Sequence, residues 1–442
     1  MRNLFRLLSV LAAVSLAVAV GLIAVDFFQA QGKFPYATYI GEVNVSGLEQ
    51  AEAYDKLSRL SVSGIYTPVV TFESEKQLIS FSPEALGIGL DIERTVRQAF
   101  EATHSQSYLK ELKERLQNGP VRSRLIFAVN EEQLRSVLET LAAELDSTPK
   151  DASLVLFEET GGYNIEPDEM GREIKINETV ELFKSRLAAE EKFFPLVVEY
   201  TRPRVTEKDL RAFPPVHRLS AYTTYYGRHD SPNRIHNIKL IASWLEGTLL
   251  LSGETFSLNQ VIGDITPERG FKEAYTIIGG ELVPSLGGGA CQIATTLFNT
   301  VSLADLKVIQ RRNHSFYFNI YPLGRDATVY PGQLDFKFVN DSGHPVLIKA
   351  VATNRRLSFR LYGTTTGKTV KFSGPYVEML ESGAYRPAAV KEVLSADSPF
   401  RTTVARRVYD AAGKLLKEDV LHSYYKLYGE KSNVPIARPE PR

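Results

Sequence analysis

The chain has 442 residues, of which 43% are hydrophobic and 24% are charged, a composition typical of a globular protein with about two to four domains. Lysine plus arginine and aspartate plus glutamate both number 52, so the formal net charge is zero. This balance excludes the basic excess of a nucleic-acid-binding protein, and we expect no nucleic-acid partner. The single cysteine, Cys291, excludes an internal disulfide.

The N-terminal residues predict where the protein is located in the cell. Arg2 and Arg6 precede an uncharged run, residues 7–25, which is nearly long enough to cross a hydrocarbon core of about 30 Å. The positive flank favours a cytoplasmic N-terminus and an extracytoplasmic bulk of the chain. We therefore expect a single-pass anchor in the cell membrane. The alternative is a cleaved signal peptide, which would release a secreted form.

An internal repeat follows the anchor. Pro83 and Gly87 recur as Pro167 and Gly171, 84 positions further along the chain. Each copy is typical of a short strand, a helix, two strands, a loop and a second helix. The pattern predicts two tandem α+β units.

The character of the chain changes after residue 219. A helix is expected from Asn233 to the glycine at position 247, and residues 262–280 are expected to be rich in loops. Alternation predicts strands at 307–312, 315–321, 327–330, 334–340, 346–352 and 357–361, which indicates an α+β domain with an antiparallel sheet. Two further strands flank a turn at 410–413, and the proline-rich end is expected to be disordered.

The predicted fold class is therefore α+β multidomain, with one N-terminal transmembrane helix and a small C-terminal β-module. The predicted parts are an anchor and spacer (1–35), a first repeat (36–120), a second repeat (121–203), an α+β domain (204–364), the β-module (365–431) and a disordered tail (432–442).

Cys291 directly follows Gly287, Gly288 and Gly289 and begins a helical pattern. Three consecutive glycines indicate a backbone with positive φ, or one that another group approaches closely. At a helix N-terminus, the unpaired N–H groups and the macrodipole favour a thiolate.

Several collinear motifs of residues 219–350 together resemble the VanW family. They are Tyr222-Thr223-Thr224-Tyr225-Tyr226, Asn233-Arg234, Asn237-Ile238, residues 253–259, Gly287-Gly288-Gly289-Ala290-Cys291-Gln292, residues 295–299, His314-Ser315, residues 324–329 and Asp335-Phe336-Lys337-Phe338. The two repeats resemble the peptidoglycan-binding repeats that commonly precede a VanW domain. The resemblance implies a cell-envelope context associated with glycopeptide resistance, and peptidoglycan or its precursors as partner, but it implies no reaction.

The residue types allow a catalytic hypothesis. His314 is the natural base for Cys291, and Asp326 or Asp335 could orient its ring. Gln292, Gln260 or a glycine N–H could form an oxyanion hole. A further set is predicted to line a ligand groove: Gly287, Gly288, Gly289, Gln292, Asn259, Arg234, Asn237 and Arg325. We expect no cofactor and no metal, because the histidines lack ligand spacing.

Two functions stay open at this point. The first is an envelope enzyme that acts through Cys291 on acyl or amide bonds of peptidoglycan stem peptides. The second is a non-catalytic cell-wall binding or scaffolding module, in which Cys291 is a buried structural residue, His314 bonds to the backbone, and Asp326 pairs with Arg325 or caps a turn.

Overall fold

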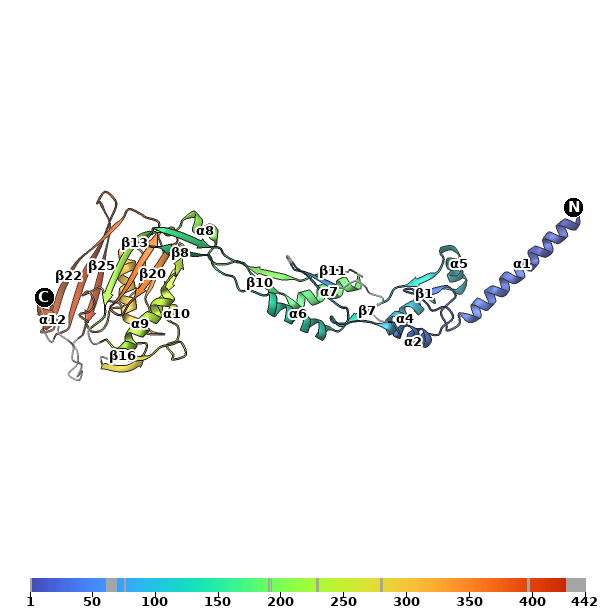
Figure 1. The fold of residues 1–442 in the computed structure, drawn as a ribbon, viewed down its shortest axis with the longest axis horizontal. Coiled ribbons are helices and arrows are strands. Elements are labelled where there is room, and N and C mark those ends of the chain that lie inside the picture. Colours follow the sequence, from blue (N-terminus) through green and yellow to red (C-terminus); the bar gives the residue numbers. More distant parts are fainter. Residues whose placement is uncertain are drawn as a thin grey trace. The chain divides into compact units, whose positions relative to one another are not determined.

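The structure is a computed structural model, and it describes residues 2–60, 70–74, 77–189, 191, 193–227, 230–278, 281–395 and 398–426. The predicted disordered tail lies outside the described residues. The chain forms two compact units, one of residues 1–149 and 170–202 and the other of residues 150–169 and 203–442 (Figure 1). This is an α+β multidomain protein, as the sequence predicts.

The first unit combines helices with short strands. Its helices are α1 (Arg2–Gln29), α2 (Gln50–Ser58), α4 (Ile92–Ala102), α5 (Tyr108–Asn118), α6 (Glu131–Leu145) and α7 (Ile176–Ala188). Its strands are β1 (Thr38–Ile40), β2 (Val43–Asn44), β3 (Val70–Ser74), β4 (Gln77–Phe81), β5 (Ile88–Leu90), β6 (Val121–Ser123), β7 (Phe127–Val129), β10 (Gly171–Ile174), β11 (Phe193–Pro195) and β12 (Val198–Thr201). The strands form small sheets with orders β2-β1-β6, β11-β3-β4, β5-β7 and β10-β12.

The predicted repeat is present in the order of the elements. With the same spacing of 84 residues, β2, α2, β5 and α4 of the first copy correspond to β7, α6, β10 and α7 of the second. The hairpin β3–β4 corresponds to β8 (Ser153–Phe157) and β9 (Gly162–Glu166). The two hairpins differ in packing, because β3 pairs with β11 in the first unit and β8–β9 belongs to the second unit.

One pair of threonines has the same structural role in the two copies. Thr95 of α4 and Thr179 of α7 are both 1% exposed. The Thr95 hydroxyl accepts a hydrogen bond from the Ile126 N–H at 3.0 Å, and the Thr179 hydroxyl accepts one from the Val197 N–H at 3.1 Å. In both copies a buried hydroxyl therefore satisfies the backbone of the segment that closes the unit.

The second unit is built on antiparallel sheets. Its longer strands are β13 (His217–Tyr225), β20 (Val346–Ala352), β21 (Arg356–Gly363), β22 (Thr369–Glu381), β24 (Phe400–Tyr409) and β25 (Leu415–Tyr425). The shorter ones are β14 (Leu249–Leu250), β15 (Thr255–Ser257), β16 (Glu273–Ile278), β17 (Glu281–Leu286), β18 (Lys307–Gln310), β19 (Lys337–Val339) and β23 (Ala384–Ala388). The helices are α8 (Glu207–Ala212), α9 (Pro232–Leu245), α10 (Leu258–Ile262), α11 (Ala290–Leu303) and α12 (Val390–Ser395).

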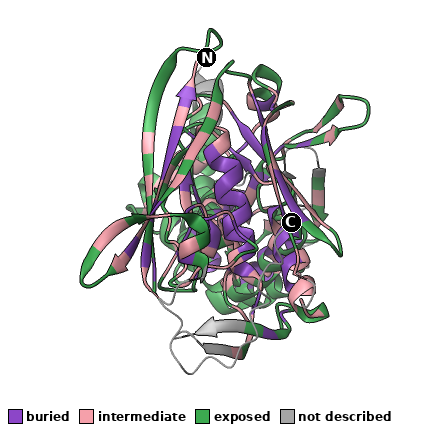
Figure 2. Cartoon of the chain, turned by 90° about the vertical axis from the view of Figure 1, so that its left-hand side faces the viewer, coloured by how far each residue is buried: buried purple, intermediate pink, exposed green. Residues whose placement is uncertain are grey.

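The core of this unit lies between one sheet and two helices. The sheet has the order β13-β21-β20-β14; α11 packs against β13 and β21, and α9 packs against β20 and α11. Ile293, Leu297 and Val301 of α11 are fully buried against it. Figure 2 shows a buried helix at the centre of the unit, and polar residues of α11 such as Thr296 and Asn299 are buried as well. The helix is therefore enclosed on all sides.

Two further sheets have the orders β15-β19-β18 and β23-β22-β24-β25, and β16–β17 and β8–β9 form two-stranded sheets. The predicted C-terminal hairpin is present as β24–β25, with the turn at Gly413 in the left-handed region. Residues 273–278, predicted to be in a loop-rich stretch, instead form β16, which pairs with β17.

Residues 315–321 and 327–330, predicted as strands, are irregular, and this prediction was wrong. Side chains and distant segments take the hydrogen bonds that a neighbouring strand would otherwise provide. The Ser315 carbonyl accepts from the Lys426 N–H at 2.7 Å, and the Ala327 N–H donates to the Thr295 hydroxyl at 2.9 Å. Alternating sequence alone does not reveal such partners.

We predict that Thr95→Val and Thr179→Val each lower the free energy of unfolding by about 1–3 kcal/mol, because each leaves a buried N–H unpaired. Hydrogen exchange should accelerate at Ile126 in the first variant and at Val197 in the second. Thr140→Val is the control, since Thr140 is exposed on α6 and bonds only within its helix. Equal protection in all three variants would contradict the prediction.

Candidate functional site

The glycine turn before α11 is shaped by close packing. Gly287 and Gly289 have φ of 82° and 118°, in the left-handed region. A Cβ atom would lie 2.7 Å from Ile265 at Gly287, 2.9 Å from Ala274 at Gly288 and 2.7 Å from Ile238 at Gly289. Both expected features are therefore present: a positive φ, at Gly287 and Gly289, and a close approach by another group, at all three glycines. In each case the approaching group belongs to the protein itself.

The turn places Cys291 in the first turn of α11, whose N-cap is Gly289. Cys291 as a whole residue is partly exposed, and its thiol lies 3.1 Å from the Thr328 hydroxyl. It also donates to the Val329 carbonyl at 3.6 Å. The side chain of His314 is near enough to lower the pKa of the thiol. The segment after His314 thus returns to the start of α11 and surrounds the sulfur.

His314 links the thiol to a buried carboxylate. Its Nδ1 lies 2.7 Å from Oδ2 of Asp326, and its backbone N–H donates to the same oxygen at 2.7 Å. Because Nδ1 is engaged in this way, Nε2 is the ring nitrogen left for Cys291. Tyr321 stacks on the imidazole at 5.3 Å and Phe318 contacts it edge-on at 5.1 Å, so the ring orientation is held from two sides.

Asp326 is held by residues that precede and follow it in the chain. Its side chain is 2% exposed, and its Oδ1 accepts from the Tyr425 hydroxyl at 2.6 Å. Arg311 donates to the Asp326 carbonyl at 2.7 Å and lies 3.4 Å from Oδ1. Asp326 therefore pairs with His314 and Arg311, whereas the guanidinium of Arg325 lies over the ring of Phe372.

These contacts shift the ionisation of the pair. Burial alone raises the pKa of the Cys291 thiol, but hydrogen bonds from His314 and Thr328, with the charge of His314, outweigh it and lower the pKa to about 7. Burial alone lowers the pKa of His314, but Asp326 and Cys291 raise it to about 9. Between these values the favoured state is a thiolate beside an imidazolium.

The pKa of Asp326 follows the same logic. Burial raises the pKa of this carboxyl, but the hydrogen bond and charge of His314, together with Arg311 and Tyr425, lower it below its ordinary value. The carboxylate is therefore ionised at neutral pH, where His314 is protonated, and it stabilises the imidazolium.

Asp335 lies in a different environment from Asp326. Its carboxylate accepts from the Ser257 hydroxyl at 2.6 Å and from the Asn259 N–H at 2.9 Å. Asn259 in turn donates through Nδ2 to the Leu334 carbonyl at 2.9 Å. Asp335 and Asn259 thus join the start of α10 to the segment before β19. The structure brings Asp326, and not Asp335, to His314.

Besides Asn259, three of the predicted groove residues bond inside the protein. Gln292 is fully buried: its oxygen accepts from Arg234 at 2.8 Å, and its Nε2 donates to Thr224 at 2.9 Å. Its side chain is therefore not a free oxyanion donor. Asn237 donates to the Gly288 carbonyl at 3.2 Å and supports the glycine turn. Arg234 also pairs with Asp230 at 2.7 Å.

Three residues at the site are absent from the sequence-based candidates: Thr328, Arg311 and Tyr425. Thr328 lies in the motif of residues 324–329, so the sequence could have identified it as a candidate. Arg311 and Tyr425 lie outside every motif, and Tyr425 comes from β25, nearly a hundred positions from Asp326. No local pattern marks such a residue.

Comparison with known proteins confirms the resemblance to VanW and peptidoglycan-binding domains. Residues 233–362 match the family model described as "VanW like protein", and residues 79–194 match the one described as "Putative peptidoglycan binding domain". The chain therefore carries a VanW-like domain that includes Cys291, His314 and Asp326. Tyr425 lies beyond the matched range. The peptidoglycan-binding match runs from β4 to β11 and so crosses both copies of the repeat.

Two relatives are informative. Uncharacterized protein YoaR of Bacillus subtilis strain 168 is 39% identical over 162 residues, which are 37% of this chain and 53% of YoaR. Vancomycin B-type resistance protein VanW of Enterococcus faecalis strain ATCC 700802 / V583 is 34% identical over 115 residues, 25% of this chain and 42% of that protein. The chain spans about half the length of these curated relatives. No solved structure matches it.

The pKa shift of Cys291 predicts how its reactivity depends on pH. Since the thiolate is the nucleophile, the rate of iodoacetamide alkylation should rise with a midpoint near pH 7. In His314→Ala the two largest contributions that oppose burial are lost, so the midpoint should rise to about the ordinary thiol value of 8.5 or above it. His236→Ala is the matched control, because His236 bonds the Gly270 carbonyl and should leave the profile unchanged. A wild-type midpoint at or above that of His314→Ala would contradict the assignment.

Proposed function

We propose that this chain, which carries a VanW-like domain and a peptidoglycan-binding domain, is a membrane-anchored extracytoplasmic protein of the cell envelope. It binds peptidoglycan or its precursors and acts on acyl or amide bonds of the stem peptides through Cys291. The two family matches support the cell-wall context. The observation that carries the catalytic proposal is the His314–Asp326 hydrogen bond of 2.7 Å beside a thiol whose pKa His314 lowers.

The series supports nucleophilic acyl transfer. The Cys291 thiolate attacks the carbonyl carbon of a stem-peptide amide, the C–N bond breaks, and His314 gives its proton to the departing amine. The acyl group is then held on sulfur as a thioester. Water or the amine of a second stem peptide attacks this thioester, His314 takes the proton back, and the thiolate is released. Water as acceptor gives cleavage, and an amine gives exchange.

The surrounding residues support these steps. Asp326 holds His314 with Nε2 toward sulfur and stabilises the imidazolium during the attack. Thr328 holds the thiol from the other side. The backbone N–H of Cys291 is the proposed oxyanion donor, because the Gln292 side chain and the N–H groups of Ala290 and Gln292 are engaged elsewhere.

The proposed anchor is α1. Within the described residues, its segment Leu8–Phe28 is the one helix long and apolar enough to cross a membrane, with a mean hydropathy of 2.7 and none of its most apolar window buried. A signal sequence has the same character. The contacts at the C-terminal end of α1 support an uncleaved helix over a removed signal peptide. Asp26 pairs with Arg115 at 2.9 Å, and Ala30 is buried in the first unit.

We predict that Cys291→Ala lowers cleavage or exchange of purified stem-peptide substrates by about 10³-fold or more, because the nucleophile is lost. His314→Ala should come close to this loss. Binding to intact peptidoglycan sacculi should be unchanged in both variants. The products are measured by chromatography of muropeptides.

Thr140→Val, at an exposed position of α6, serves as the activity control. Circular dichroism of each variant shows whether the fold is kept. Equal product profiles for wild type and a folded Cys291→Ala variant would refute the catalytic proposal and favour the non-catalytic binding module. If the wild-type protein does not bind sacculi, the proposal that it binds peptidoglycan is refuted.

A further inference from the structure

Helix α5 has an apolar outer face that the protein does not cover. Leu109 is 71% exposed and Leu116 is 77% exposed. They are seven positions apart and therefore lie on one face of the helix, with Lys113 between them. Two nearly uncovered leucines on one face of an eleven-residue helix indicate an apolar partner.

The adjacent face of α5, about 100° around the helix, is fixed to the end of α1. The Tyr108 hydroxyl lies 2.7 Å from the Asp26 carboxylate and 2.9 Å from the Ile23 carbonyl. Arg115 pairs with the same carboxylate at 2.9 Å, and its side chain is only 7% exposed. The ring of Phe27 contacts that of Tyr108 edge-on at 5.0 Å. These contacts fix the position of α5 along the axis of α1.

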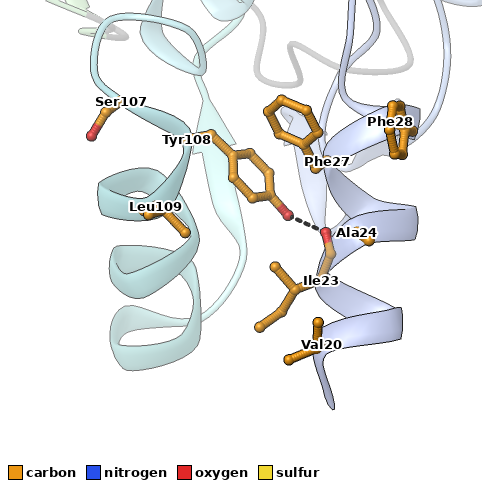
Figure 3. A pocket seen from close by; sticks show the side chains of 8 residues that line it. All are labelled: Val20, Ile23, Ala24, Phe27, Phe28, Ser107, Tyr108 and Leu109. Atoms are coloured by element: carbon orange, nitrogen blue, oxygen red, sulfur yellow. Dashed lines mark hydrogen bonds between the residues drawn. The ribbon is translucent and has the colours of Figure 1, made fainter. Parts of the chain in front are cut away.

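A shallow apolar notch lies between the two helices (Figure 3). Its volume is about 370 Å³, and its wall on α1 is made by Val20, Ile23, Ala24, Phe27 and Phe28. On the α5 side it is lined by Ser107, Tyr108 and Leu109. The dashed line in Figure 3 marks the hydrogen bond from Tyr108 to Ile23. A long apolar chain matches this lining.

The position of the notch along α1 identifies the partner. Ile23 and Phe27 belong to the last turns of the apolar segment Leu8–Phe28. With a rise of 1.5 Å per residue, Ile23 lies about 7 Å before the end of that segment. If α1 crosses the membrane, the N-terminal half of α5 stands at the boundary between headgroups and acyl chains, where tyrosine is enriched and lysine extends toward the headgroups.

We propose that α5 is an interfacial membrane helix: Leu109 and Leu116 insert among the lipids of the outer leaflet, and an acyl chain occupies the notch beside α1. The proposal rests on the membrane anchoring proposed above. Lys110 and Lys113 are offset by Glu111 and Glu114, so the attachment depends chiefly on apolar burial. Because α1 and α5 both contact the bilayer, the first unit is held in one orientation on its surface.

The test measures membrane depth at single labelled positions. The full-length chain carries one cysteine, so Cys291→Ser provides a background without cysteine. Leu109→Cys and Leu116→Cys are then introduced one at a time, labelled with an environment-sensitive fluorophore and reconstituted in vesicles of phosphatidylcholine and phosphatidylglycerol. Both sites are exposed, so the substitutions do not disturb packing. Nitroxide lipids with shallow or deep spin labels report the depth.

Two control positions make the outcomes distinguishable. Val14→Cys lies within the apolar segment of α1 and reports whether the anchor spans the bilayer. Leu78→Cys on β4 is a matched exposed leucine, at 66%, outside both helices. We expect deep quenching at Val14, shallow quenching with a blue-shifted emission at Leu109 and Leu116, and neither at Leu78.

Quenching at Val14 without quenching at Leu109 and Leu116 would overturn the interfacial helix and leave the anchor standing. Equal shallow quenching at Leu78 would also overturn it, because contact with lipid would then not be specific to α5. Absence of quenching at Val14 would refute the anchor and the interfacial helix together.

Discussion

The buried carboxylate of Asp326 holds the candidate site together. One of its oxygens forms hydrogen bonds with both the backbone N–H and the ring Nδ1 of His314, and the other accepts a hydrogen bond from the Tyr425 hydroxyl. An isolated carboxylate in such a place would be strongly destabilising, so its hydrogen bonds and the charge of Arg311 are what permit its burial. The same contacts determine where His314 points. The geometry at Cys291 therefore depends on a group that does not itself touch the sulfur.

Helix α11 imposes a second constraint, because it is buried on every side and yet rich in polar residues. Each buried hydroxyl or amide on it needs a partner. Thr295 bonds Ala327, and Asn299 donates to the Arg325 carbonyl at 2.8 Å. These bonds fix the segment that contains Asp326 at a set height along the helix. The helix thus positions the nucleophile with its first turn and the carboxylate with its next two turns.

The C-terminal sheet belongs to the same assembly. Strand β25 supplies Tyr425, and the chain at its end bonds both neighbours of His314. The Tyr424 carbonyl accepts from the Asn313 side chain, and the Lys426 N–H donates to the Ser315 carbonyl. Arg406 of β24 donates to the Ser302 carbonyl, at the end of α11, at 2.8 Å. The VanW-like match ends at residue 362, well before these strands. The part of the chain that holds His314 and Asp326 in place therefore extends beyond the matched domain.

Much of this protein could be predicted from its sequence, because several of its features are local. Periodicity marked α9, α11 and the strands β20 and β21, the spaced prolines and glycines marked the repeat, and Gly287 to Gly289 marked a turn that no other residue fits. The order of Cys291, His314 and the two aspartates named the candidates for the site. Only the tertiary structure selected Asp326 over Asp335, engaged Gln292 inside the core and brought Tyr425 to the carboxylate. These contacts join residues dozens of positions apart, and a pattern read over a few turns carries no information about which distant groups meet. The irregular segment after β18 was mispredicted for the same reason, since its backbone is satisfied by the side chains of α11 and by β25.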